Sequence, residues 1–311
     1  MGLRWRGLGW HVRSLAILVL RYPTAGPRQV RRGQDLGPVL QGISRRRRLA
    51  NMLRAMVRRP REPGSVWAVT MVRNEEDIVG YTVRHLLRQG VDRVVVADHG
   101  STDSTPEILA RLAAEDPRVV VVRDRTPGYF QHVQMTRLAL VACAAGAEWI
   151  VPFDADEAWY AAGGRPLAEV LRSCREDVLA AGLEFYSPIA GVDSPNPYVR
   201  FQHRSARLRV EKVVFRAHPL ARLRMGNHDV DRPGPRGEGV RVAHVPYRSV
   251  PQMIAKVRQG AAVIELTFGA GGAAATHWQK LGALTDDQLA DRFAEFLTRQ
   301  DLIHDPVPGQ D

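Results

Sequence analysis

Two aspartates separated by a single residue, Asp154 and Asp156, directly follow an apolar run from Trp149 to Phe153. The run predicts a buried strand, and side chains two residues apart on an extended chain point to the same side. Two carboxylates at the carboxyl end of a strand suit a hard divalent cation that leaves room for phosphate oxygens. Open α/β sheets also bind their ligands at this edge. The alternative is a polar strand end with two solvated acids, so the surrounding sequence has to decide.

The composition is that of a globular protein whose charge is unevenly distributed. The 311 residues are 45% apolar and 25% charged, enough for one large domain or two smaller ones. Residues 1–61 contain fifteen arginines, no lysine and one acid, Asp35, which leaves −3 of the net +11 for residues 62–311. We expect 1–61 to be a poorly ordered Arg-rich extension and 62–311 to be the folded domain. A peripheral contact with an anionic membrane is the functional alternative for the extension, and no specific nucleic acid is expected.

The cysteines and the apolar runs bear on the compartment. Cys143 and Cys174 form no metal or disulfide spacing, which indicates free thiols in a reducing compartment. The apolar run from Ser14 to Leu20 is too short to span a bilayer. We therefore expect a cytoplasmic protein, with a peripheral position at the inner membrane face as the alternative.

The elements that position Asp154 alternate regularly. Strands are expected at 66–72, 91–98, 118–122 and 149–153, separated by helices at 74–89, 105–114 and 130–145. Asn74 is expected to cap the first helix. The alternation predicts an α/β fold with a doubly wound, mostly parallel sheet. No Gly-x-Gly-x-x-Gly motif follows the first strand, so the dinucleotide-binding fingerprint is absent. The sequence also lacks the Gly-x-x-x-x-Gly-Lys-Ser/Thr motif, which argues against a P-loop protein.

The second half of the chain is less regular. We assign residues 66–160 to a nucleotide-binding half and 161–300 to an acceptor-side half. The pattern predicts three helices, at 165–175, 250–266 and 285–298. Short strands are expected at 178–185, 198–203, 212–216 and 240–245, and a long mobile loop at 226–239.

Polar side chains follow three of the predicted strands. Arg73 and Glu75 come after the first strand, Asp98 ends the second, and Asp154 and Asp156 follow the fourth. Acceptors at such strand ends bind ribose hydroxyls or a base N–H, and a metal held by the later acids neutralises a diphosphate. Together they predict a site for a nucleoside diphosphate compound. The alternatives are a helix-capping charge for Glu75 and a turn-forming acid for Asp98.

Three segments carry a family resemblance. Residues 69–75, 98–105 and 153–157 resemble the signatures of family 2 glycosyltransferases of the GT-A fold, and more closely a bacterial subgroup with an Asp-x-Asp-Glu metal motif. The resemblance covers roughly 66–260. His99 departs from it, because many members carry Asp or Asn there.

The resemblance implies a metal-dependent inverting glycosyltransferase that moves a sugar from a nucleotide sugar, UDP-linked in the favoured interpretation, to a glycan, lipid or small-molecule acceptor. Arg73, Glu75 and Asp98 would contact the nucleoside. Asp154 would lie near the ribose or diphosphate, and Asp154 and Asp156 would ligate Mn²⁺ or Mg²⁺.

Further roles fall in the second half. The segment 243–249 resembles a His-Tyr-x-Tyr-Arg-Ser segment of the subgroup, so His244 would be a metal ligand unless it is a structural histidine. Arg248, with Lys256, would hold phosphate oxygens, and the alternative is two solvated helix charges.

An inverting transfer needs a base that removes the acceptor proton. Asp229 is the favoured candidate and His228 the second, while a plain surface loop is the alternative for both. Trp159 is expected to bind the acceptor through its ring, or else to belong to the core. Weaker base candidates are Asp231, Glu184 and Asp193.

Two other classes remain open at this point. A haloacid-dehalogenase-like phosphotransferase also uses Asp-x-Asp after a strand, but Glu157 and Ala158 break its pattern. The third class is a non-catalytic protein that binds nucleotide sugars or polyanions, with the Arg-rich segment as its active surface.

Overall fold

The computed structural model describes residues 62–310 apart from 127, 129, 193, 206–209, 269–275 and 300. The expectations for residues 1–61, and Asp193 as a base candidate, lie outside this part of the chain.

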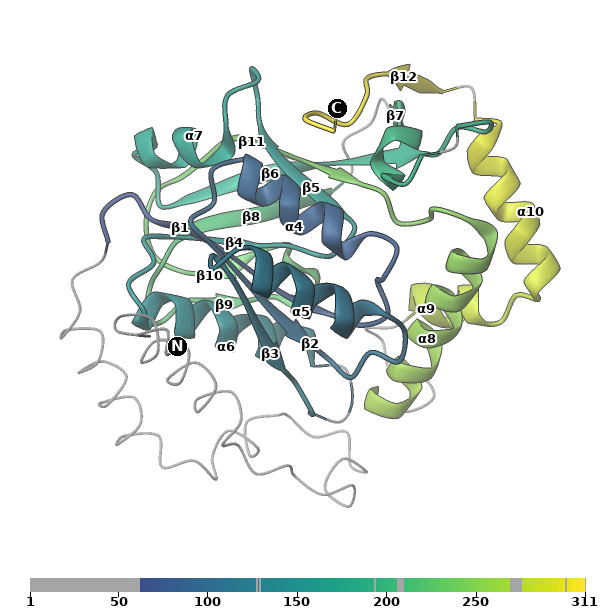
Figure 1. Ribbon diagram of the computed structural model, residues 1–311, viewed down its shortest axis with the longest axis horizontal. Coiled ribbons are helices and arrows are strands. Elements are labelled where there is room, and N and C mark those ends of the chain that lie inside the picture. The colour runs from purple at the N-terminus through teal and green to yellow at the C-terminus, as the bar shows by residue number, and fades with distance from the viewer. Residues whose placement is uncertain are drawn as a thin grey trace, which may run out of the picture.

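The centre of the molecule is a parallel sheet (Figure 1). Its strands β1 (Val66–Val72), β2 (Arg93–Asp98), β3 (Val119–Arg123) and β4 (Trp149–Pro152) lie in the order β4-β1-β2-β3 with every neighbouring pair parallel. These strands are buried on both faces, which is why they are continuous apolar runs rather than alternating ones. The register pairs Val72 with Asp98, so the polar residues that follow both strands emerge at one edge.

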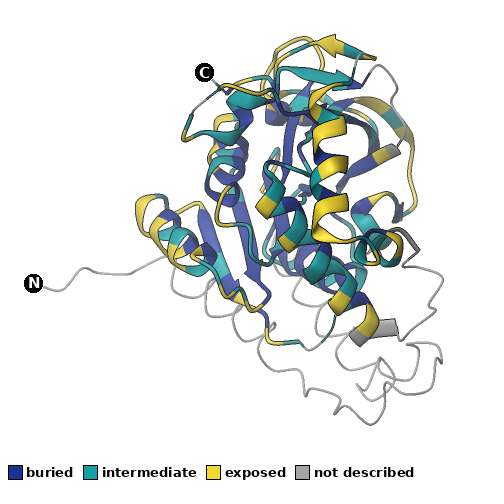
Figure 2. Cartoon of the chain, turned by 90° about the vertical axis from the view of Figure 1, so that its right-hand side faces the viewer, coloured by how far each residue is buried: buried dark blue, intermediate teal, exposed yellow. Residues whose placement is uncertain are grey.

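Helices cover both faces of this sheet, as the sequence predicts. Helices α4 (Val79–Arg88) and α5 (Thr105–Glu115) contribute to one buried apolar cluster, and α6 (Gln131–Ala144) contributes to a second one. Figure 2 shows the buried residues along the strands and exposed residues on the outer sides of the helices. The predicted doubly wound α/β architecture is confirmed.

The expected N-cap at Asn74 is wrong. Asn74 has φ 54°, a left-handed conformation that asparagine tolerates, and α4 begins only at Val79. Its side-chain oxygen accepts a hydrogen bond from the backbone N–H of Thr102 at 2.8 Å. The loop after β1 therefore binds the loop after β2 instead of starting a helix.

The second half of the chain extends the sheet with antiparallel pairs. Strand β8 (Val210–Arg216) pairs antiparallel with β4 and with β6 (Val178–Ser187). Strand β11 (Arg236–His244) pairs parallel with β6 and antiparallel with β5 (Glu157–Ala161), a strand that the sequence analysis missed. A short strand β7 (His203–Ser205) joins β6 to β12 (Leu302–His304).

Two local predictions in this half are wrong. The strand expected at 198–203 is largely the 3-10 helix η1 (Pro197–Arg200), because Pro197 starts a turn and the Asn196 side chain accepts from the N–H of Tyr198. The loop expected at 226–239 contains strand β10 (Val230–Asp231), which pairs with β9 (Arg222–Leu223), and the start of β11. Its Gly and Pro residues mark tight turns rather than a mobile segment.

The remaining helices are α7 (Leu167–Ser173), α8 (Val250–Phe268), α9 (Thr276–Gly282) and α10 (Asp286–Leu297). Helices α8, α9 and α10 pack together around a small core of their own (Figure 1). A capping box at Thr285 fixes the start of α10.

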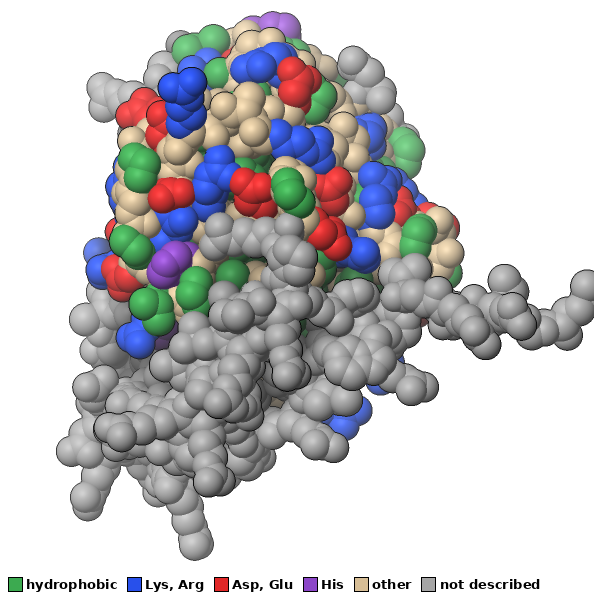
Figure 3. Space-filling model, turned by 90° about the vertical axis from the view of Figure 1, so that its left-hand side faces the viewer, with side chains coloured by type: hydrophobic (Ala, Val, Ile, Leu, Met, Phe, Trp, Pro, Cys, Tyr) green, Lys and Arg blue, Asp and Glu red, His purple; other side chains and the backbone are tan. Residues whose placement is uncertain are grey.

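The described surface mixes both charges. On the face drawn in Figure 3, acidic and basic side chains lie interspersed over the described residues. None of the helices in the described part of the chain combines the length and apolarity needed to cross a bilayer.

Candidate active site

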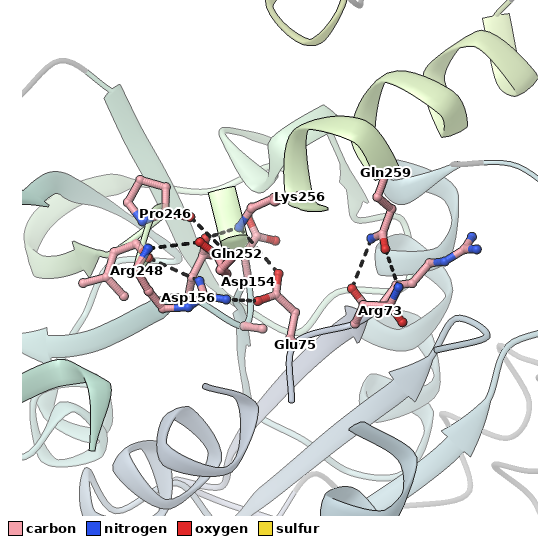
Figure 4. A network of polar contacts seen from close by, with 12 residues as sticks. Arg73, Glu75, Asp154, Asp156, Pro246, Arg248, Gln252, Lys256 and Gln259 are labelled. Carbon is pink, nitrogen blue, oxygen red and sulfur yellow. Dashed lines mark hydrogen bonds and ion pairs between the residues drawn. The ribbon is translucent and has the colours of Figure 1, made fainter. Parts of the chain in front are cut away.

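Helix α8 faces the sheet edge at which β1 and β4 end. Three of its polar residues, Gln252, Lys256 and Gln259, are spaced so that they share one side of the helix. Figure 4 shows Lys256 directed toward Glu75 and Gln259 directed toward Arg73, both on the loop after β1. The predicted strand-end residues are thus covered by a helix from the second half of the chain.

Asp156 lies at the centre of this contact. Its Oδ2 is 2.5 Å from Nζ of Lys256 and 3.4 Å from Nε2 of His244. The same Lys256 nitrogen is 3.5 Å from Oε1 of Glu75. Burial alone would raise the pKa of Asp156, but the charges of Lys256 and His244 hold the pKa well below its ordinary range. The structure therefore brings Glu75, Asp156, His244 and Lys256 together, as predicted for residues of one site.

Arg248 is committed to carboxylates. Its Nη2 is 2.6 Å from Glu75, and its Nε is 2.6 Å from Asp77. The guanidinium is buried, and its Nη1 donates to the carbonyl of Val245 at 3.3 Å. Arg248 thus fixes Glu75 in the site, whereas the expected contact with phosphate would require these bonds to change.

Asp154 faces a different set of partners. Its Oδ2 is 2.7 Å from Nζ of Lys212, and its Oδ1 accepts from the side-chain amides of Gln131 at 3.1 Å and Asn227 at 3.2 Å. Lys212 also lies 2.7 Å from Oε1 of Glu157, and both residues of this pair are buried. Three donors therefore hold the Asp154 carboxylate.

Glu157 organises the turn that carries the two aspartates. Its Oε2 accepts from the backbone N–H of Asp154 at 3.0 Å and from Nε1 of Trp159 at 3.3 Å. The ring of Trp159 is fully buried. The expected role of Trp159 in binding the acceptor is therefore wrong, since its ring packs in the core beside Glu157 rather than at an open face.

A divalent cation is implied by the Asp-x-Asp-Glu motif, and part of a binding set is present. In the described residues, no group of three or more His, Cys, Asp and Glu side chains is arranged to hold a metal ion. Asp156 Oδ2 and His244 Nε2, 3.4 Å apart, do fit two neighbouring ligands of one ion. Ligand atoms about 2.1 Å from an octahedral ion are about 3 Å from each other, and diphosphate oxygens and water complete such shells. Asp154 points to its three donors instead of to this pair.

The residues that the sequence analysis predicted to contact the nucleoside are hydrogen-bonded to loops and to α8. Oδ1 of Asp98 accepts from the N–H of Ser101 at 3.0 Å, which is the turn-forming contact foreseen as its alternative role. The carbonyl of Arg73 accepts from Nε2 of Gln259 at 3.2 Å. His99, where the family pattern differs, lies with Nδ1 3.0 Å from Oδ2 of Asp124. Its ring thus joins the end of β2 to the segment after β3.

The two base candidates differ in their surroundings. Burial would raise the pKa of Asp229, but the N–H of Val230 and the guanidinium of Arg236 lower it, and Oδ1 lies 2.7 and 2.9 Å from these donors. Burial lowers the pKa of His228. Its Nδ1 is 2.9 Å from the carbonyl of Glu211, so Nδ1 carries the proton and Nε2 is the unprotonated nitrogen.

Sequence reasoning missed several residues of the site. The sequence analysis singled out none of Lys212, Asn227 and Gln131. A lysine directly before the apolar residues 213–215 of strand β8 is a recognisable signal, because a buried lysine needs a carboxylate partner. The amides of Gln131 and Asn227 carry no comparable signal in the sequence.

The sequence also matches a known protein family. The model of "Glycosyl transferase family 2" matches residues 67–226, just over half of the chain. The chain belongs to glycosyl transferase family 2. The predicted family and enzyme class are confirmed, and the haloacid-dehalogenase-like alternative is wrong.

Individual relatives and solved structures are similar to this chain over short stretches or at low TM-scores. The succinoglycan biosynthesis protein ExoA of Rhizobium meliloti (strain 1021) is 44% identical over 63 residues, which are 20% of this chain and 18% of that protein. TarS of S. aureus in complex with UDP has a TM-score of 0.34 at 15% identity, covering 76% of this chain and 71% of that chain. Glucosyl-3-phosphoglycerate synthase of Mycobacterium tuberculosis, in complex with Mn²⁺, UDP and glucosyl-3-phosphoglycerate, has a TM-score of 0.27 at 17% identity, covering 44% of this chain and 47% of that one.

Proposed function

We propose that the protein is a metal-dependent, inverting glycosyltransferase that transfers a sugar from a nucleotide sugar to a hydroxyl acceptor. The observation that carries the proposal is the convergence of Glu75, Asp156, His244 and Lys256 at the carboxyl edge of the parallel sheet. In open α/β sheets this edge binds nucleotides, and family 2 membership supplies the class of reaction.

The donor would bind between this edge and α8. Arg73, Glu75 and Asp98 follow β1 and β2, where they face the nucleoside in the proposal. Asp156 and His244 would hold Mn²⁺ or Mg²⁺, which supplies charge neutralisation for the diphosphate. The ammonium of Lys256, already beside Asp156, adds a second positive charge at the same place. Uridine is the nucleoside to test first.

His228 is the base that the geometry favours over Asp229. In the proposed step its Nε2 takes the proton of the acceptor hydroxyl while the acceptor oxygen bonds to the anomeric carbon and the bond from that carbon to the diphosphate oxygen breaks. The neighbouring residue Asn227 donates to Oδ1 of Asp154 at 3.2 Å, so the turn that carries His228 lies beside this aspartate. Asp229 is a weaker base because two arginines, Arg224 and Arg236, stabilise its charged form.

A thermal-shift panel tests the proposal. UDP, UDP-glucose, UDP-N-acetylglucosamine, GDP-mannose and ADP are added with and without Mn²⁺. We expect UDP or a UDP sugar to raise Tm in a Mn²⁺-dependent way. Asp156→Asn should abolish most of this shift, whereas Asp116→Asn, which removes an exposed ion pair with Arg118, should not. If no nucleotide moves Tm with or without Mn²⁺, the proposed function is wrong.

Activity is measured next, as nucleoside diphosphate released from whichever nucleotide sugar stabilises the protein. A glycan, lipid or small-molecule acceptor should raise this release above the rate with water alone. Product analysis by NMR shows whether the anomeric configuration is inverted, and a retained configuration would refute the direct displacement.

A further inference from the structure

A short turn on the acceptor side lies directly against the Asp154 carboxylate. The turn comprises residues 225–228, and its two central residues have left-handed backbone conformations, φ 73° at Gly226 and φ 59° at Asn227. A Cβ atom at position 226 would lie 2.5 Å from ring atoms of His228. Position 226 therefore admits only glycine while the His228 ring keeps this place.

Two side-chain amides attach the turn to Asp154. Gln131, at the start of α6, accepts from the N–H of Gly226 at 2.9 Å and donates to Oδ1 of Asp154 at 3.1 Å. Asn227 donates to the same oxygen at 3.2 Å. Gln131 is 5% exposed and Asn227 is fully buried, so water does not compete for these bonds. Each amide also orients the carboxylate.

The other end of the turn is attached to β8. Nδ1 of His228 is 2.9 Å from the carbonyl of Glu211, and the next residue along the strand, Lys212, holds Oδ2 of Asp154. One carboxylate thus links α6, β8 and the turn, and the His228 ring is fixed relative to the strand end that carries the metal motif.

Backbone stability by itself does not call for asparagine at position 227. Glycine adopts a positive φ without steric cost. Oδ1 of Asn227 is buried without a hydrogen-bond partner among the described residues, and such an unpaired group destabilises the folded state. The amide of Asn227 therefore destabilises the fold through its oxygen, and its hydrogen bond to Asp154 is the interaction that glycine could not make.

We propose that Gln131 and Asn227 are positioning residues that hold His228 in place for proton abstraction by fastening its turn to the Asp154 carboxylate. The inference rests on the proposed function, in which His228 is the base. It assigns Asp154 to the acceptor side of the site as the anchor of this turn. A simple structural role would be to hold the turn closed without any effect on how His228 reacts.

The first test separates the two roles by kinetics. Asn227→Gly keeps the backbone conformation and removes the amide, and Gln131→Met keeps the approximate length and removes the hydrogen bonds. The control is Thr136→Val, which removes another bond from α6, the one that Thr136 Oγ1 accepts from the N–H of Leu223 at 2.9 Å. The assay follows UDP release from the UDP sugar that raises Tm in the thermal-shift panel, with water as the acceptor.

The two amide variants should lose about tenfold or more in kcat while KM for the donor and the UDP–Mn²⁺ thermal shift stay near wild type. The control should change kcat less than about twofold. In a His228→Gln background the same substitutions should have almost no further effect, because the group that they position is gone. Unchanged kcat in both variants, or losses that multiply in the His228→Gln background, would overturn the inference.

A second measurement does not need turnover. The ¹⁵N NMR spectrum of the histidine side chains should show His228, assigned through His228→Gln, as a neutral ring protonated at Nδ1 at pH 7.5. Asn227→Gly should convert it to a mixture of tautomers, whereas Thr136→Val should leave it unchanged. An unaltered His228 signal in Asn227→Gly would refute the positioning role even if the wild type turned over no sugar nucleotide, an outcome that would count separately against the proposed function.

Discussion

Nζ of Lys256 lies 2.5 Å from Oδ2 of Asp156, although one hundred residues separate the two along the chain. Both side chains are largely buried, and among the described residues Glu75 is the only other carboxylate within ion-pair distance of this ammonium. An ammonium in this position is a fixed positive charge beside the carboxylate expected to ligate a metal. Substitutions at this site should therefore change metal binding, nucleotide binding and stability.

Lys256→Met should strengthen the binding of Mn²⁺ to the protein in the absence of nucleotide. The ammonium and the divalent cation compete for the same Asp156 oxygen, so removing the ammonium relieves the competition. Titration of Mn²⁺ followed by EPR should give a lower Kd than in the wild type, by about tenfold. Lys280→Met, on α9, is the control and should leave Kd unchanged. A variant that binds Mn²⁺ no better than wild type would show that Lys256 does not contest the ion.

Glu157→Gln should destabilise the protein by about 3 kcal/mol, because it leaves the buried ammonium of Lys212 with Asp154 as its one remaining carboxylate. Urea unfolding at pH 7 measures the change in the free energy of unfolding. The matched control is Glu115→Gln, which removes an exposed pair with Arg84 whose side chains are 46% and 50% accessible. The control should cost less than about 1 kcal/mol. Equal effects of the two substitutions would contradict the assigned role of Glu157.

Arg248→Lys should lower both stability and nucleotide binding although it keeps the charge. The guanidinium reaches Glu75 and Asp77 together, at 2.6 Å each, and one ammonium cannot reproduce this fork. We expect a loss of about 2 kcal/mol in urea unfolding and a smaller UDP–Mn²⁺ thermal shift. Arg172→Lys, at an exposed bidentate pair with Asp92, is the control and should change little. Wild-type behaviour of Arg248→Lys would mean that its bidentate geometry is unimportant.

The stability of the fold should decrease on mild acidification because of His85. Nε2 of His85 is 2.7 Å from the carbonyl of Trp159, and Nδ1 is 2.9 Å from Nε2 of Gln310 near the end of the chain. Burial lowers the pKa of His85 from 6.5 to about 4. Between these values the unfolded chain binds a proton that the folded protein does not, so the stability is fully present above pH 6.5 and falls as the pH falls toward 4.

The expected loss from this residue is about 3 kcal/mol between pH 7 and pH 4. Urea unfolding at pH 7.0, 5.5 and 4.5 measures it, and His85→Gln should flatten the profile over this range. The decisive comparison is the slope: if the variant and the wild type lose stability in parallel, His85 is not the group that titrates.

How much of this protein could be read from its sequence depends on how local the signal is. The four central strands were predicted closely, because strands buried on both faces are continuous apolar runs. The strand predicted at 198–203 was wrong because Asn196 and Pro197 favour a turn. The hydrogen bond from the N–H of Tyr198 to the Asn196 side chain stabilises a 3-10 helix there, in spite of the apolar pattern. Trp159 was assigned either to the acceptor or to the core, because the sequence does not tell which side of strand β5 is covered by other elements, and the structure places it in the core.

The sequence by itself determined the order of strands and helices, the family, and the acids at the strand ends, since each is expressed in neighbouring residues. Only the tertiary structure decided what those acids face. Asp154 meets Lys212, which is 58 residues away, and Asp156 meets Lys256, which is 100 residues away. The periodicity of a segment reports which of its faces is buried, but the partner on that face is set by how distant elements pack. The packing of those elements placed Asp154 against the turn that carries His228 and Asp156 against the ammonium of Lys256.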